Sequence, residues 1–177
     1  MLKLTNKNED TKETSEKPIE FTNTLINKSI FTSIIEKYKN IGMDCYHKHI
    51  AIIYDGDNVL SWGYNQSAYG SDLPIHAEFD AIRNLPPWVK KNRIVPAKIM
   101  VVRINNHNKF LNSKPCSICA KTIINQPVKH GYIIKKVSYS LDDGSFEEKS
   151  LQEMIDEISS TDDKELYKSK YYRRQRK

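Results

Sequence analysis

The chain has 177 residues and a formal net charge of +6, from 28 lysines and arginines against 22 aspartates and glutamates. This length suits one domain with a substantial core. No apolar run is long enough for a membrane span and no signal-peptide pattern is present, so we expect neither.

A polar segment precedes the first predicted elements. Residues 1–20 are rich in Lys, Glu, Asn and Thr and hold almost no apolar residues, so we expect this N-terminal tail to be disordered. Apolar residues at helical spacing predict an amphipathic helix over 22–39. A β-hairpin is predicted next, with strands at 51–54 and 59–64 joined by the turn Asp55-Gly56-Asp57-Asn58.

Helices and strands alternate in the second half of the predicted domain, which we place at 21–160. The sequence predicts, in order, a helix at 76–84, a strand at 98–104, a helix at 116–125, a strand at 132–140, a short strand near Phe146 and a last helix opened by a capping box of Ser150 and Glu153. A helix between two strands favours a parallel crossover, whereas the hairpin is antiparallel. This order therefore predicts a mixed sheet covered by helices.

The charge excess lies entirely at the end of the chain. Residues 166–177 carry six basic residues and no acidic one, so the rest of the chain holds 22 of each sign. Tyr167, Tyr171 and Tyr172 alternate with these charges. We treat 161–177 as a basic tail with two interpretations: a nucleic-acid contact or nuclear address, or a solvated tail that aids solubility.

Two short motifs supply the side chains of a metal site. A His-Ala-Glu sequence opens one predicted helix, and a Pro-Cys-Ser-Ile-Cys sequence opens the next. Their His76, Cys116 and Cys119 offer one imidazole and two thiolates, which is a suitable donor set for a catalytic zinc that keeps its fourth position for water. Glu78 need not bind metal and can move protons. Pro115 suits the first position of its helix, where its missing N–H would be unpaired anyway.

A Cys-x-x-Cys pair has other interpretations, which the sequence leaves open. A structural zinc site would need a second pair of ligands, and His47 and His49 are candidates. A redox pair would follow a strand directly, whereas the loop 105–114 lies between the strand and the cysteines. Cys45 is expected to be a buried apolar residue. With two of the three cysteines assigned to metal, we expect a reducing compartment, the cytoplasm or alternatively the nucleus.

The two motifs resemble the His-x-Glu and Pro-Cys-x-x-Cys signature of the cytidine deaminase superfamily. The sequence Gly63-Tyr64-Asn65 resembles the Gly-aromatic-Asn element of its dCMP deaminase branch. The resemblance covers about residues 22–140 and implies an α/β fold, a three-layer α/β/α sandwich with a mixed central sheet, which usually forms a homo-oligomer. It also implies bound Zn2+, and substrate contacts from Asn65 and from the backbone N–H groups of Ala77 and Cys116.

The same resemblance implies hydrolytic deamination, in which the C4 amine of cytosine becomes a carbonyl and ammonia leaves. Glu78 would then carry protons from water to the ring and to the leaving amine. A small nucleotide or nucleoside is expected as substrate, with dCMP favoured, because the neutral body lacks the basic contacts of a long polynucleotide groove. One alternative is a polynucleotide deaminase that uses 166–177 to bind tRNA, RNA or single-stranded DNA. Another is a deaminase that acts on adenine and not on cytosine, and a third is a non-catalytic member of the family that zinc stabilises. Further candidates for the edge of the substrate pocket are Tyr69, the loop 105–114 with its Phe110, and residues 140–143.

Overall fold

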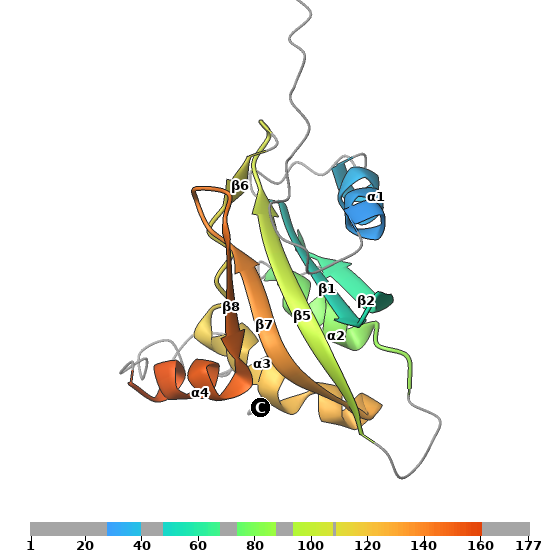
Figure 1. Ribbon diagram of the computed structural model, residues 1–177, viewed down its shortest axis with the longest axis vertical. Helices are drawn as coiled ribbons and strands as arrows, with labels where there is room; N and C mark the ends of the chain where they lie inside the picture. Colours follow the sequence, from blue (N-terminus) through green and yellow to red (C-terminus); the bar gives the residue numbers. More distant parts are fainter. Residues whose placement is uncertain (1–27, 40–47, 68–73, 88–93, 108, 161–177) are drawn as a thin grey trace, which may run out of the picture.

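A mixed β-sheet with helices on both faces forms the molecule (Figure 1). The computed structural model describes residues 28–39, 48–67, 74–87, 94–107 and 109–160. The predicted N-terminal and basic tails, 1–20 and 161–177, lie outside the described residues, as do Cys45, His47 and Tyr69. No helix among the described residues combines the length and the apolar character that crossing a bilayer requires.

The elements follow the predicted order, with short additions. They are α1 (Lys28–Lys39), β1 (Lys48–Asp55), β2 (Asn58–Tyr64), β3 (Gln66–Ser67), β4 (Pro74–Ile75), α2 (Ala77–Arg83), β5 (Val95–Ile104), β6 (Phe110–Leu111), α3 (Ser117–Asn125), the 3-10 helix η1 (Pro127–His130), β7 (Tyr132–Ser140), β8 (Phe146–Ser150) and α4 (Leu151–Ser160). The strands pair in the order β2-β1-β5-β7-β8, and β6 also pairs with β5. Strands β5 and β7 are parallel, while the hairpin β1–β2 and the pair β7–β8 are antiparallel, so the predicted mixed sheet is confirmed.

The two faces of the sheet carry separate cores, which confirms the three layers. Alternate residues of β1 point to opposite faces. Ile50 and Ile52 pack with α1, in a cluster that also contains Phe31 and Ile35. On the other face, Ala51 packs with apolar residues of α2, α3 and α4. Because both faces are covered, β1 and β5 appear in the sequence as continuous apolar runs and not as alternating ones.

Local signals account for several element ends. Gly56 has a φ of 56°, and this left-handed conformation closes the two-residue turn of the predicted hairpin. The capping box of α4 is present, because the Ser150 N–H donates to Glu153 Oε2 and the Glu153 N–H donates to Ser150 Oγ. Helix α1 is confirmed from residue 28 onward, and the predicted start at 22–27 lies outside the described residues.

The loop predicted at 105–114 contains a strand pair that the sequence analysis missed. Phe110 pairs with Ile104 in β6 and packs edge-on against Phe146, with ring centroids 5.5 Å apart. Its ring is buried in the core on the α1 face. The prediction that Phe110 borders the substrate pocket is therefore wrong, since burial of this ring against the sheet outweighs exposure at a loop.

Candidate active site

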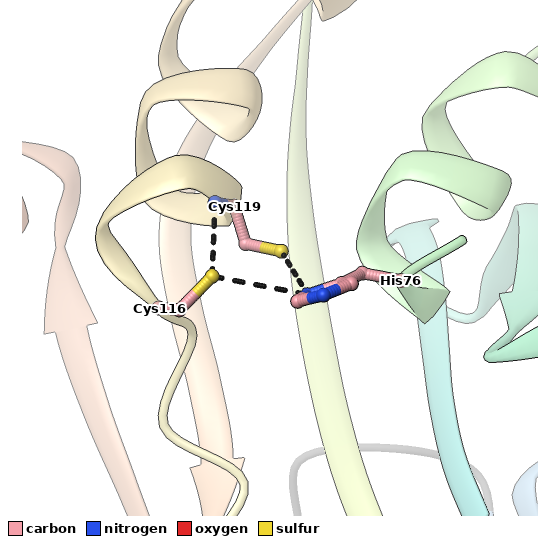
Figure 2. A group of neighbouring side chains, drawn as sticks. All are labelled: His76, Cys116 and Cys119. Atoms are coloured by element: carbon pink, nitrogen blue, oxygen red, sulfur yellow. Dashed lines mark hydrogen bonds between the residues drawn. The ribbon is translucent and has the colours of Figure 1, made fainter. Parts of the chain in front are cut away.

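The two predicted motifs meet at the N-termini of α2 and α3 (Figure 2). His76 is the N-cap of α2, and its Nδ1 lies 3.1 Å from Cys119 Sγ and 3.8 Å from Cys116 Sγ. Among the described residues, these three form the group that offers ligand atoms to a metal, and all three ligand atoms lie within 4.8 Å of one another. His49 is not a member of this group, so a structural site built on the His47–His49 pair receives no support from the described residues.

The donor atoms fit a tetrahedral zinc. Zinc ligated at ordinary bond lengths separates an imidazole nitrogen from a thiolate sulfur by about 3.6 Å, and two sulfurs by about 3.8 Å. The two nitrogen–sulfur distances, 3.1 and 3.8 Å, lie on either side of that value. Three such ligands leave a fourth position open, as in catalytic zinc sites. A redox pair of cysteines alone would not require the imidazole that lies against both sulfurs.

Cys116 begins α3 in an unusual way. It is the N-cap, and its Sγ accepts a hydrogen bond from the Cys119 N–H at 3.5 Å. Pro115 consequently precedes the cap, so its predicted place at the first helical position is wrong by two residues. The reason is that sulfur takes the role that a Ser or Asp oxygen usually plays at a helix start. An N-cap side chain accepts from the N–H two or three residues later, so a spacing of three residues lets the Cys119 N–H reach Cys116 Sγ.

The environment of the thiols favours one thiolate at the helix start. Hydrogen bonds lower the pKa of Cys116 to about 4. The largest contribution comes from the Cys119 thiol, followed by the His76 ring and then the Cys119 N–H. The hydrogen bond to Cys116, together with burial, raises the pKa of Cys119. The hydrogen bond with Cys116 also raises the pKa of His76. Two sulfurs and one imidazole therefore share protons over a few ångströms, which is a site that a divalent cation can take over by displacing them.

Glu78 lies beside this centre without being one of its metal ligands. It is only 6% exposed, and burial raises the pKa of its carboxyl group. His76 and Glu78, two residues apart, converge on one cavity because His76 is the N-cap and Glu78 lies in the first turn of α2. A buried carboxyl group with a raised pKa is suited to accepting a proton and passing it on.

Two of the metal ligands, His76 and Cys116, border a cavity of about 280 Å³ together with Glu78. Its described lining is His49, Asn65, Pro74, His76, Ala77, Glu78, Ser113, Lys114 and Cys116. This volume is close to the lower end of small-molecule sites, about 300 Å³. Of the six residues predicted for metal, catalysis and substrate, five line the cavity, and Cys119 lies in the metal group.

Asn65 has both a structural and a cavity-facing position. Its Oδ1 accepts hydrogen bonds from the His49 N–H at 2.7 Å and the Tyr38 hydroxyl at 3.0 Å. Its own backbone N–H donates to the His49 carbonyl at 3.1 Å. The amide oxygen thus connects β1, α1 and the end of β2, and Asn65 also lies in the lining of the cavity.

Helix α2 is fastened closely to β2 by Ser61 and Asp80, which the sequence analysis did not single out. Ser61 Oγ donates to the Ala81 carbonyl at 2.7 Å, and the Tyr64 N–H donates to buried Asp80 Oδ2 at 3.3 Å. Gly63 lies between these contacts, where a Cβ would come within 2.2 Å of the Ala81 nitrogen. The glycine inside a strand pattern was the available signal, because it often marks a close backbone approach.

The segment before Pro115 is held by a buried pair of hydroxyl groups. Ser113 Oγ and Ser140 Oγ are 2.9 Å apart, and Ser113 Oγ also donates to the Val101 carbonyl at 2.8 Å. Ser140 Oγ donates to the Leu111 carbonyl at 2.7 Å. These bonds connect the segment to the ends of β5 and β7, and we call them the Ser113–Ser140 clamp.

The predicted substrate edge at 140–143 has a different position. None of these residues is among those that line the cavity. Ser140 is buried in the clamp, and Asp142 Oδ1 accepts a hydrogen bond from the Asn112 N–H at 2.8 Å. The prediction that Ser140 forms an edge of the substrate pocket is therefore wrong, and the segment supports the loop that borders the cavity.

Comparison with known proteins agrees with the chemistry of the site. The model of a family described as the cytidine and deoxycytidylate deaminase zinc-binding region matches residues 30–135. No curated protein sequence matches the chain.

Three similar solved structures have low identity to this chain. The dCMP deaminase of cyanophage S-TIM5 in apo form is 19% identical, with a TM-score of 0.41, and the alignment covers 72% of this chain and 90% of that one. The cytidine deaminase of Burkholderia pseudomallei is 15% identical, with a TM-score of 0.47 and coverages of 72% and 94%. That of Mycobacterium leprae is 14% identical, with a TM-score of 0.43 and coverages of 73% and 97%. We base the family assignment on the family model.

Proposed function

Because the chain belongs to the cytidine and deoxycytidylate deaminase family, and is thus a zinc-dependent hydrolytic deaminase, we propose that it deaminates a cytosine nucleotide or nucleoside, with dCMP favoured. The observation that carries the proposal is Glu78, a buried carboxyl group that borders the cavity beside three metal ligands. A zinc site that served only folding would have no use for an unligated carboxyl group in this position.

His76, Cys116 and Cys119 would hold the zinc, whose Lewis acidity makes water nucleophilic near neutral pH. Glu78 accepts a proton from the attacking water and delivers protons to the ring nitrogen and to the leaving amine. The balance is one water consumed and one ammonia released, with the C4 amine replaced by a carbonyl. The backbone N–H of Ala77 belongs to the first turn of α2 and has no partner within the helix, so it can donate to the ring.

The size of the cavity supports a small substrate. About 280 Å³ suits a single nucleoside or nucleotide and not several stacked bases. The Asn65 amide, at the rim formed by β1 and β2, is proposed to contact the sugar or the base. The polynucleotide alternative depends on residues 166–177, which lie outside the described part of the chain. Assembly as a homo-oligomer and a cytoplasmic location stay predictions.

The test is deamination by the zinc-loaded protein of cytidine, deoxycytidine, CMP, dCMP, adenosine and a single-stranded oligonucleotide, followed by mass spectrometry. Glu78→Gln should keep zinc, measured by metal analysis, and lose turnover. Asp57→Asn is the matched control, since it removes an exposed carboxylate from the hairpin turn. Continued turnover by Glu78→Gln would rule out the proton-transfer role, and turnover of adenosine alone would rule out cytosine as the base.

A further inference from the structure

The part of the cavity outside the metal centre is lined by groups that favour an anion. Its described side chains there include His49, Asn65 and Lys114, while Glu78 is the one carboxylate in the described lining. Ser113 is already used in the clamp. A cytosine ring requires a few N–H donors, but a neutral nucleoside gives no reason for a lysine in the lining of the same cavity. Lys114 is therefore the lining residue that the proposed chemistry leaves unexplained.

Lys114 is fixed at its backbone and paired at its end. Its N–H donates to Asn112 Oδ1 at 3.0 Å, one residue before Pro115. Its Nζ lies 2.9 Å from Glu157 Oε2 of α4, and the two side chains are 47% and 39% exposed. An ion pair as exposed as this contributes little to stability, because water and salt screen it. The long, flexible side chain can therefore exchange this partner for another anion at the cavity.

Glu157 keeps a partner when Lys114 leaves it. Lys149 Nζ also contacts Glu157, and it lies 3.1 Å from Glu147. The Lys149 side chain is only 15% exposed and stays beside both carboxylates. Release of Lys114 from Glu157 therefore leaves no carboxylate without a cation. This arrangement gives the Lys114 ammonium a partner in the absence of substrate, and Lys114 can leave that partner at little cost in free energy.

We infer that Lys114 is a specificity-determining residue that binds the phosphate of a cytosine mononucleotide. This inference rests on the proposed function, since it assumes that the ring lies beside Glu78. A phosphate monoester carries more charge than one carboxylate, so it competes well for the ammonium. Lys114 then distinguishes a nucleotide from the corresponding nucleoside, while Glu157 holds the side chain when no phosphate is present.

The experiment compares ligands that differ only in the phosphate. We would titrate dCMP and deoxycytidine into zinc-loaded Glu78→Gln protein by calorimetry, and repeat the titrations with Lys114→Met added. The ratio of dCMP affinity to deoxycytidine affinity should fall about tenfold or more, as expected for loss of a charge-assisted hydrogen bond. Lys129→Met removes one exposed charge in η1, distant from the cavity, and should leave the ratio as it is.

A second variant separates phosphate binding from the packing of α4. Glu157→Gln breaks the same ion pair but keeps Lys114, so the affinity ratio should stay or rise. An equal fall in Glu157→Gln and Lys114→Met would overturn the inference, because the effect would then come from α4. An unchanged ratio in Lys114→Met would overturn it as well. So would loss of affinity for a single-cytosine oligonucleotide with dCMP binding intact, since the ligand would then be a strand.

The outcome for the phosphate is independent of the outcome for the reaction. A protein that binds dCMP through Lys114 but deaminates no cytosine compound contradicts the proposed function and supports the phosphate contact. A protein that deaminates deoxycytidine and dCMP, with an affinity ratio that Lys114→Met does not change, supports the proposed function and contradicts the phosphate contact.

Discussion

Gly63→Ala is the substitution for which the structure makes its sharpest prediction. A Cβ at this position would lie 2.2 Å from the Ala81 nitrogen, 2.6 Å from the Asp80 carbonyl carbon and 2.8 Å from the Ala77 oxygen. All three are backbone atoms of α2, which no rotamer change can move. Restoring an ordinary contact of 3.4 Å requires that β2 and α2 separate by about 1 Å. Overpacking of this kind costs about 1–3 kcal/mol, and we expect the upper end because backbone must shift.

The displacement should reach the metal centre, because α2 carries His76 at its start. We expect Gly63→Ala to lower the free energy of unfolding by about 3 kcal/mol and to reduce turnover by up to about a hundredfold, the loss that a 1 Å misplacement can produce. Urea denaturation, zinc competition with a chromophoric chelator and the deamination assay measure these three quantities.

The sign of the stability change makes the test decisive. In a position without steric conflict, Gly→Ala stabilises a protein by about 0.4–1 kcal/mol, because it restricts the unfolded chain. A Gly63→Ala protein that is as stable as the wild type, or more so, and that binds zinc normally would therefore refute the close approach of β2 to α2.

Two further predictions concern the other half of the centre and the metal. Ser140→Ala removes one hydroxyl group of the Ser113–Ser140 clamp, so it should lower the free energy of unfolding by about 1–3 kcal/mol through unsatisfied buried partners and should also weaken zinc binding. The control Ser138→Ala, in the same strand and also buried, should lower stability but keep zinc affinity. Equal zinc affinities in the two variants would contradict the role of the clamp. Removal of zinc with a chelator should lower the melting temperature of the wild type, since a ligand bound only to the folded state stabilises it. Cys119→Ala should melt lower and respond little to the chelator, and a full response in that variant would show that the zinc is bound elsewhere.

The sequence predicted those features that depend on neighbours along the chain. The hairpin follows from Gly56 and its apolar flanks, and the start of α4 follows from the spacing of Ser150 and Glu153. The metal ligands were predictable for the same reason, because two of them are three residues apart in one helical turn. Their convergence with His76 came from the family resemblance, which brings together segments that are forty residues apart in the sequence.

Residues that work through distant contacts were not predictable in the same way. Nothing near Ser113 indicates that it meets Ser140, twenty-seven residues later, since a serine in a loop is ordinary. Phe110 was placed at the pocket because its loop leads into Cys116, whereas the pairing of β6 with β5 puts its ring in the core. In both cases the partner is chosen by the order of strands in the sheet, which a local pattern does not contain.

The two halves of the centre are held by different parts of the sheet. His76 and Glu78 lie at the start of α2. This helix is fastened to β2, at one side of the sheet, through Ser61 and Asp80. Cys116 and Cys119 lie directly after the segment that the clamp fastens to β5 and β7, so their positions depend on that segment. Strand β1 lies between these attachments, paired with β2 on one side and with β5 on the other. The ligand distances therefore depend on the register of these strands, and damage to either attachment should weaken metal binding.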